Sequence, residues 1–424
     1  MKKVFIIVFL TALVISSCKK RESVSVIPAN ASMVVSLDML KFSTESDLID
    51  SKLFEQACRV LKINPLDMGI DFTEPLYIFQ LGNDYVCITA SVGDEDNMTD
   101  CLSQYAKEKI AVKPKKSGEL TWSKLFGEVD LAYNDETLLL VYRTGDTGIN
   151  AKQMIRSLFE LKEEESFYAT EHFSRMNDIT SSDIVVYSNL SAMSENVQNI
   201  VSNFLPENVG KDAVKMISTL DSEDGALVIS SKIYSDKDNV QKVLDEQSQS
   251  LTKLEGDYLS KVPERSFVTL MAGIKGDKLH KFVNSIPQLS TQLTVASFAI
   301  DYDLDELINS TEGDIMICYD DNGDMMWNIN GEQNTHLPNA TANWDGPCKE
   351  LDITTRDISK CCIYGYVDLS QTDMKQYTRL ISLPSIYQCV NSLTDIRFYS
   401  EGLGDITIRI ESSNNENIFK QLLK

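Results

Sequence analysis

Short runs in which apolar and polar residues alternate recur along the chain, and segments with helical spacing of apolar residues separate them. Alternation with a period of two predicts half-buried strands, and a period near 3.6 predicts amphipathic helices. Residues 406–410 alternate most cleanly, with isoleucine at every second position. Residues 51–61 show the helical spacing, and Asn64-Pro65 predicts where that helix ends.

The first third of the chain illustrates both patterns. Helices are predicted at 98–109 and 150–161, and the turn residues around 82–84 predict a hairpin. Predicted strands are 33–37, 74–79, 85–90, 120–126, 129–133 and 138–142.

The same succession of elements returns later in the chain. A strand that runs into a helix recurs at 32–38, 182–190, 262–270 and 362–369. A strand, a short polar joint and a helix recur at 86–105, 138–159, 226–244 and 406–422, with Asp, Asn and Ser at the joints as good N-caps. We interpret this as loose internal duplication, although any α+β chain repeats strand, turn and helix to some extent by chance.

These patterns predict an α+β fold built from tandem units of antiparallel strands with helices packed on one face. The expected organisation is a signal peptide at 1–17, a lipidated tether at 18–25 and α+β units at 26–165, 166–260 and 261–424, the last with two half-repeats. A chain of 424 residues is long enough for two or three domains with ample core.

The amino-terminal segment differs from everything that follows. It has a basic start at Met1–Lys3, an apolar run from Val4 to Ile15 broken by Thr11, and small residues before Cys18. These are the parts of a secretory signal, and the apolar run is shorter than the roughly 20 residues that a spanning helix needs.

The end of this segment resembles a bacterial lipobox, with Ile15 and Ser17 preceding Cys18. The resemblance implies thioether lipidation of Cys18, cleavage before it and acylation of the new amine. Two or more acyl chains would anchor the protein stably in a membrane. The alternative is an ordinary secretory signal with Cys18 beside the cleavage site by chance. The basic residues 19–21 favour the periplasmic side of the outer membrane over surface export.

Charge restricts the partners. The chain has 40 Lys and Arg against 63 Asp and Glu, a formal net charge of −23. This excess repels polyanions, so we expect no nucleic-acid partner.

Nine cysteines are present. Besides Cys18, eight remain, an even number that permits disulfides in an oxidising compartment. Cys87 with Cys101 and Cys318 with Cys348 are the possible pairs, because each pair lies within one predicted unit. Buried thiols are the alternative. No CxxC motif occurs.

The search for chemistry finds little. The three histidines, His172, His280 and His336, lie far apart in the sequence, and no hydrolase, phosphate-loop or dinucleotide motif is present. We therefore expect no cofactor and no metal. Residues 301–312 resemble a calcium loop but have Glu306 where glycine is required. Three tryptophans, Trp122, Trp327 and Trp344, could stack on a sugar, or could be partly buried core residues.

One resemblance extends over most of the chain. The lipobox, the segment 26–31 with the strand that follows it, and residues 69–77 are similar to a family of Bacteroidota envelope lipoproteins that carries a domain of unknown function. The resemblance implies an envelope lipoprotein and supplies no catalytic residues.

Together these observations favour a non-enzymatic binding or scaffold lipoprotein, anchored by its lipid and contacting an envelope protein or a glycan. Two alternatives are a periplasmic hydrolase whose site assembles only in the fold, and a lipoprotein that captures glycans or nutrients. A deep pocket with carboxylates and a histidine would favour the hydrolase. A groove with exposed Trp or Tyr would favour glycan capture, and an extended apolar patch would favour a protein partner.

Overall fold

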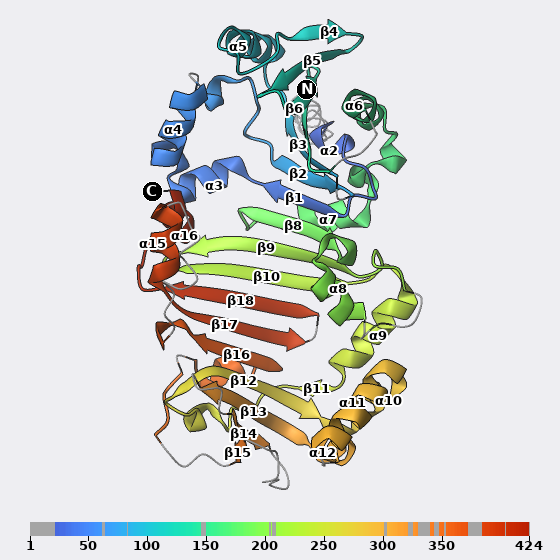
Figure 1. Cartoon of the computed structure of the whole chain (residues 1–424), viewed down its shortest axis with the longest axis vertical. Helices are drawn as coiled ribbons and strands as arrows, with labels where there is room; N and C mark the ends of the chain where they lie inside the picture. Colours follow the sequence, from blue (N-terminus) through green and yellow to red (C-terminus); the bar gives the residue numbers. More distant parts are fainter. Residues whose placement is uncertain are drawn as a thin grey trace, which may run out of the picture. The chain divides into compact units, whose positions relative to one another are not determined.

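A computed structural model provides the structure of the protein (Figure 1). It describes residues 22–61, 64–82, 84–145, 150–202, 205, 209–300, 303–320, 325–329, 340–342, 347–351, 353–371, 384–402 and 404–423. The signal segment and Cys18 lie outside the described residues.

The chain divides into two compact units. Unit 1 comprises the described residues within 1–39 and 58–178, and unit 2 those within 40–57 and 179–424. The chain therefore enters unit 2 at Leu40, returns to unit 1 at Cys58 and enters unit 2 again at Ile179. This division differs from the three units expected from the sequence, because the strands of the second and third expected units pair with one another in unit 2.

Unit 1 is built on an antiparallel sheet with the strand order β1-β2-β3-β7-β6-β5-β4. Its strands are β1 (Met33–Leu37), β2 (Leu76–Leu81), β3 (Tyr85–Ser91), β4 (Lys115–Ser117), β5 (Leu120–Leu125), β6 (Val129–Tyr133) and β7 (Thr137–Arg143). These bounds confirm the strands predicted in this region to within one or two residues.

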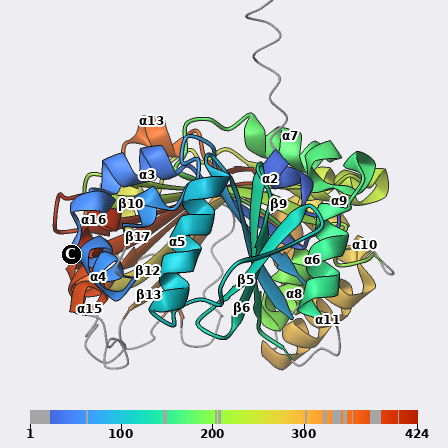
Figure 2. The same cartoon turned by 90° about the horizontal axis from the view of Figure 1, so that it is seen from above.

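Helices cover both faces of the unit 1 sheet, as Figures 1 and 2 show for α5 (Glu95–Lys107) and α6 (Ala151–Phe159). The N-cap Asp94 begins α5 by accepting a hydrogen bond from the Asn97 N–H at 2.9 Å. Buried side chains of α5 pack on Leu131 and Tyr133 of β6, whereas α6 contacts the sheet from the other side. The remaining helices are α2 (Glu22–Ser25) and α7 (Glu171–Asn177).

Unit 2 contains a longer sheet, with the order β8-β9-β10-β18-β17-β16-β12-β13-β14-β15. All of these pairs are antiparallel except β14 with β15, and β11 adds two residues beside β12. The strands are β8 (Ile184–Asn189), β9 (Lys215–Glu223), β10 (Ala226–Tyr234), β11 (Leu251–Thr252), β12 (Ser266–Lys275), β13 (Glu312–Asp320), β14 (Met325–Ile329), β15 (Ala340–Ala342), β16 (Ile363–Asp368), β17 (Leu393–Gly402) and β18 (Asp405–Ser412).

The helices of unit 2 are mostly short. They are α3 (Met39–Ser46), the start of α4 (Lys52–Leu61), α8 (Glu195–Ser202), α9 (Asp238–Ser248), α10 (Gly276–Ser285), α11 (Pro287–Ile300), α12 (Leu304–Ser310), α13 (Thr355–Ile358), α15 (Pro384–Ser392) and α16 (Ile418–Leu423). In both views α8 and α9 lie toward one end of the long strands, and α15 and α16 toward the other (Figures 1 and 2).

The order of elements repeats four times. Each repeat has a strand, a helical connection and a hairpin, and its three strands pair in sequence as β1-β2-β3, β8-β9-β10, β12-β13-β14 and β16-β17-β18. Within unit 2, the second and fourth repeats join through β10 and β18, and the third and fourth through β12 and β16. The four strands that the sequence rhythm singled out are the first strands of these repeats. The fold belongs to the α+β class, as predicted.

Candidate functional site

One face of the unit 2 sheet is lined with aliphatic side chains. The register places these residues on the same face, because directly paired residues of adjacent strands point to the same side. We call this surface the aliphatic face, and its large side chains are Ile184, Val186, Leu220, Leu227, Ile229, Val268, Leu270, Ile315, Ile317, Tyr319, Ile363, Val367, Ile396, Phe398, Ile406, Ile408 and Ile410. Tyr319 is the most exposed of them, at 43%.

None of these large side chains is fully buried; each remains partly accessible to solvent. The opposite face of the same strands contrasts with it, because it carries fully buried residues such as Met271, Met316 and Tyr364. These belong to a core with Leu254 and Ile358 from the connecting segments. The core of unit 2 therefore lies on one side of the sheet, and the side that is richer in aliphatic residues stays half-exposed.

Gly365 and Phe398 are in close contact across neighbouring strands of the aliphatic face. They are directly paired on β16 and β17, and a Cβ atom at Gly365 would overlap the ring of Phe398. The Phe398 ring therefore occupies the space that a side chain at position 365 would need, so only glycine fits there.

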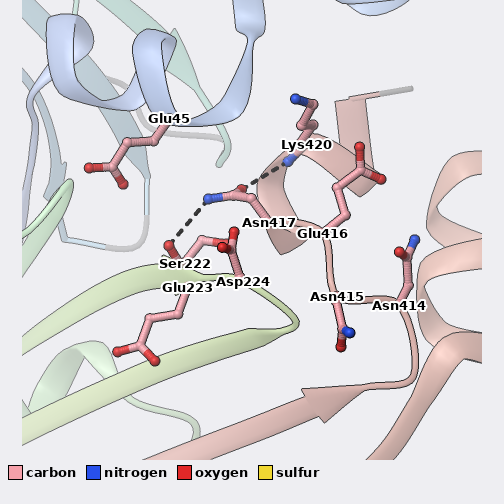
Figure 3. A pocket seen from close by; sticks show the side chains of 9 residues that line it. All are labelled: Glu45, Ser222, Glu223, Asp224, Asn414, Asn415, Glu416, Asn417 and Lys420. Atoms are coloured by element: carbon pink, nitrogen blue, oxygen red, sulfur yellow. Dashed lines mark hydrogen bonds between the residues drawn. The ribbon is translucent and has the colours of Figure 1, made fainter.

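A polar hollow lies at the edge of unit 2, where the β9–β10 turn meets α16 (Figure 3). It has a volume of about 730 Å³ and is lined by Glu45, Ser222, Glu223, Asp224, Asn414, Asn415, Glu416, Asn417 and Lys420. Figure 3 shows Asn417 between the β9–β10 turn and α16, where its Nδ2 donates to the Ser222 carbonyl at 3.2 Å and its Oδ1 accepts from the Lys420 N–H at 3.1 Å.

The residues around this hollow hold the segment 40–57 on the rest of unit 2. The Lys420 ammonium forms an ion pair with Asp47, and the rings of Phe42 and Phe419 lie 5.1 Å apart. Glu223 is paired with Arg409. The groups of the hollow are thus engaged in structural contacts, which explains their clustering.

The buried carboxylate of Asp183 lies close to Glu45. The Asp183 side chain is fully buried, and its Oδ1 lies 3.1 Å from the Lys41 Nζ of α3. Burial and then the nearby negative charge of Asp183 raise the pKa of the Glu45 carboxyl above its usual range. Lys41 also donates to the Ser181 carbonyl, so a single cation ties α3 to the segment that contains Ser181 and Asp183.

The eight cysteines within the described residues are thiols, so neither of the two possible pairs, Cys87 with Cys101 and Cys318 with Cys348, is joined by a disulfide there. Cys87 is buried on β3, while Cys101 belongs to the α5 core cluster, which does not include Cys87. Cys318 is buried on β13 with its Sγ 3.6 Å from the Thr269 Oγ1, and Cys348 is exposed beside Pro263. Burial raises the pKa of the Cys87 thiol to about 12.

The other sequence candidates are dispersed. His172 is buried on α7, His280 contacts Asp305 at 3.2 Å, and His336 lies outside the described residues. Asp303, from the calcium-like stretch, is instead the N-cap of α12. Trp122 is buried, whereas Trp344 and the side chain of Trp327 lie outside what the structure describes.

The described residues contain neither a metal-binding cluster nor a membrane-spanning helix. Among them, no group of three or more His, Cys, Asp or Glu side chains is arranged to hold a metal ion. No described helix combines the length and the apolar character needed to cross a membrane.

Comparison with known protein families identifies a family to which most of the chain is similar. The model of a domain of unknown function, DUF4836, matches residues 24–328. The chain belongs to this family. The DUF4836 match begins inside α2 and ends inside β14, so β16, β17 and β18 lie beyond it although they complete the unit 2 sheet.

Other comparisons add little to the DUF4836 assignment. No curated protein matches the chain. One similar solved structure, titled "Structure of crystal form I of TP0453", shares 11% identity, covers 53% of this chain and 85% of its own, and gives a TM-score of 0.32. A likeness this slight carries no argument about fold or function.

The aliphatic face was not predicted as a site, because the alternation at 406–410 was interpreted only as that of a half-buried strand. The structure shows that Thr407 and Arg409, the residues between the isoleucines, are also half-buried, and the alternation alone could not indicate this.

Proposed function

We propose that this DUF4836 protein is a lipid-anchored, non-enzymatic binding or scaffold protein of the bacterial cell envelope, and that it holds a partner protein on its aliphatic face. The half-exposed aliphatic face carries the binding part of this proposal. The Cys18 motif supports the anchoring part. The basic residues after Cys18 support a place on the periplasmic side of the outer membrane.

The extent and chemistry of the face favour a protein partner. Contiguous apolar surface beyond a few hundred Å² on a soluble protein marks an interaction site. The face runs without interruption across the strands from β8 to β13, so it is contributed by three repeats of the sheet. Its large aliphatic side chains offer no hydrogen bonds, which a glycan would require.

Site-specific photo-crosslinking tests the partner. A photoactivatable residue at position 408 faces the partner, and the same residue at 407 is the matched control, because it lies next along β18 and points to the opposite face. In living cells, we expect a crosslinked protein with the probe at 408 and none with it at 407. Equal crosslinking at both positions would refute the docking surface, and crosslinks only to lipid or to a second copy would replace the proposed partner.

The substitution Ile408→Asn should reduce crosslinking from a probe at Phe398 at least fivefold, since it places an amide in the centre of the apolar contact. Thr407→Asn is the control. Far-ultraviolet circular dichroism and the Tm of both variants must match the wild type for the comparison to count.

Mass spectrometry of the mature amino terminus tests the anchor. We expect Cys18 to carry a diacylglyceryl group and an amide-linked acyl chain, and Cys18→Ala to prevent membrane attachment. An unmodified, freely secreted chain would refute this part. Proteolysis of the protein on intact cells, without lysis, would refute the periplasmic orientation.

A further inference from the structure

Three cationic residues lie on the face of the unit 1 sheet that carries Trp122. The Lys152 Nζ lies 5.8 Å and the Arg156 Cζ 5.7 Å from the centroid of the Trp122 ring. Lys115 is the direct partner of Trp122 across the β4–β5 pair, so its side chain leaves the sheet on the same face. Lys152 and Arg156 are one turn apart on α6, the helix that covers this face.

These cations differ from many others in the chain. Within the described residues, none of the three has a carboxylate oxygen within 4.0 Å, whereas Lys116 pairs with Glu95 and Lys124 with Asp130. In a chain with a net charge of −23, three neighbouring cations without an acidic partner are unexpected. The ring quadrupole of a tryptophan attracts them but leaves their N–H groups able to donate.

A hollow opens beside this cluster. It has a volume of about 470 Å³ and lies between the β4–β5 turn, the β6–β7 turn and the end of α6. Arg156 lines it together with Ser117, Gly118, Glu119, Leu120, Asn134, Phe159 and Glu160. Asn134 uses its Oδ1 to accept from the Glu136 and Thr137 N–H groups, which leaves its Nδ2 as a donor.

A second observation sets this place apart. Trp122 is 7% exposed, and its Nε1–H is buried without a hydrogen-bond acceptor in the described part of the chain. A buried donor without an acceptor costs roughly 1–3 kcal/mol. A bound group with oxygen acceptors that approached the cations around the ring could also satisfy this donor.

We propose that this hollow binds a phosphate group, carried either by a soluble phosphate ester or by a lipid headgroup. A phosphate monoester carries close to two negative charges and three acceptor oxygens, which match three cations. The guanidinium of Arg156 binds such a group with two parallel N–H bonds, while Lys115 and Lys152 act as point charges. Of the three cations, Arg156 lines the hollow, together with Glu119 and Glu160, whereas Lys115 and Lys152 belong to the neighbouring cluster. These five side chains together have a formal charge of 3 − 2 = +1, against the negative charge of the whole chain.

The site lies in unit 1, so it depends neither on the aliphatic face nor on the lipid anchor. Calorimetric titration of the detergent-solubilised full-length protein with glycerol 3-phosphate and with inorganic phosphate tests the soluble source. Flotation of the Cys18→Ala chain with vesicles of phosphatidylcholine, with and without phosphatidic acid, tests the headgroup source without interference from the acyl chains.

We expect saturable binding of at least one probe, weakened at least tenfold by Arg156→Gln and by Lys115→Gln, and weakened by added salt. Lys107→Gln is the matched control, since it removes an exposed cation from α5 in the same unit, and it should change the affinity less than twofold. If neither glycerol 3-phosphate nor phosphatidic acid binds saturably, the proposal is wrong. Equal weakening by Lys107→Gln would also overturn it, because it would indicate a general charge effect.

Discussion

At the scale of single residues, a carboxylate and an ammonium decide how the segment 40–57 is held. The Asp183 side chain is completely buried and forms an ion pair with Lys41, which is itself mostly shielded from water. Removing one partner of such a pair leaves an uncompensated charge, whereas replacing both removes the problem. Glu45 adds a second carboxyl to the same place, so negative charge is crowded there.

This pairing gives a prediction for Lys41. Lys41→Met should lower the free energy of unfolding by about 3 kcal/mol, because Asp183 is then buried without its cation. Adding Asp183→Asn should restore most of the loss. Urea denaturation of the single and double variants measures both values. Losses that simply add in the double variant would show that the two side chains do not interact.

Glu45 gives a prediction with a pH dependence. Its pKa is raised in the folded protein, so the folded state binds this proton more tightly than the unfolded chain does. The stability that protonation contributes is therefore complete below the usual glutamate pKa and is lost as the pH rises through the raised value. Glu45→Gln mimics the protonated form and should raise the Tm slightly at pH 7 and leave it unchanged near pH 4.

The size of this effect is limited by solvent, because 38% of the Glu45 side chain is exposed and water screens its charge. We expect about 0.5 kcal/mol or less at pH 7. A destabilised variant at neutral pH would mean that the 3.9 Å contact of Glu45 with Lys41 outweighs the repulsion from Asp183.

At the scale of elements, packing across neighbouring strands is most demanding where Phe398 covers Gly365. Gly365→Ala should lower the free energy of unfolding by about 1–3 kcal/mol, since the added methyl group displaces the ring. Gly402→Ala on β17 is a control, because its Cβ would meet one flexible serine hydroxyl at 3.4 Å. Combining Gly365→Ala with Phe398→Leu should recover part of the loss in urea denaturation, and no recovery would contradict the proposed clash.

Local elements could be predicted from the sequence, and their order in the sheet could not. The β-rich runs and the turn residues around 82–84 located β2 and β3 together with the hairpin between them, because each strand is specified by its own residues. The pairing of β10 with β18 joins residues that are far apart in sequence, and no residue of either strand names its partner. The repeats were visible as a rhythm, but the sequence did not reveal that the fourth repeat lies between the second and third.

The candidate sites show the same contrast between local features, which the sequence reveals, and features that form only when distant segments assemble. The lipobox-like motif at Cys18 is local and can be read from the sequence alone, whereas the aliphatic face requires three repeats to be assembled in one sheet. The cluster around Trp122 joins β4, β5 and α6, and its cations are unremarkable when each is read alone.

At the scale of the whole molecule, each unit is built from separate pieces of chain. Residues 40–57 belong to unit 2, although unit 1 precedes and follows them. They contact the C-terminal helix α16 through Asp47 and Phe42. Unit 2 is therefore incomplete in any fragment that starts after unit 1.

This leads to a prediction for fragments. Residues 179–424 alone should unfold at a lower urea concentration than unit 2 does in the full chain, because Asp183 has lost Lys41. Appending residues 40–57 to its C-terminus through a flexible linker should raise the midpoint, since α16 already ends beside that segment. Equal midpoints with and without the appended segment would show that it contributes nothing to unit 2.

The strands made last occupy the middle of the unit 2 sheet. β16, β17 and β18 lie between β10 and β12, which follow each other closely in the chain. A ribosome delivers the chain from its amino terminus, so β10 and β12 emerge with open edges before β16, β17 and β18 have been made. Open edges of this kind invite pairing with other chains. Newly made molecules should therefore depend on a holding chaperone until β18 has been synthesised, and premature termination before residue 360 should yield aggregates instead of a smaller soluble protein.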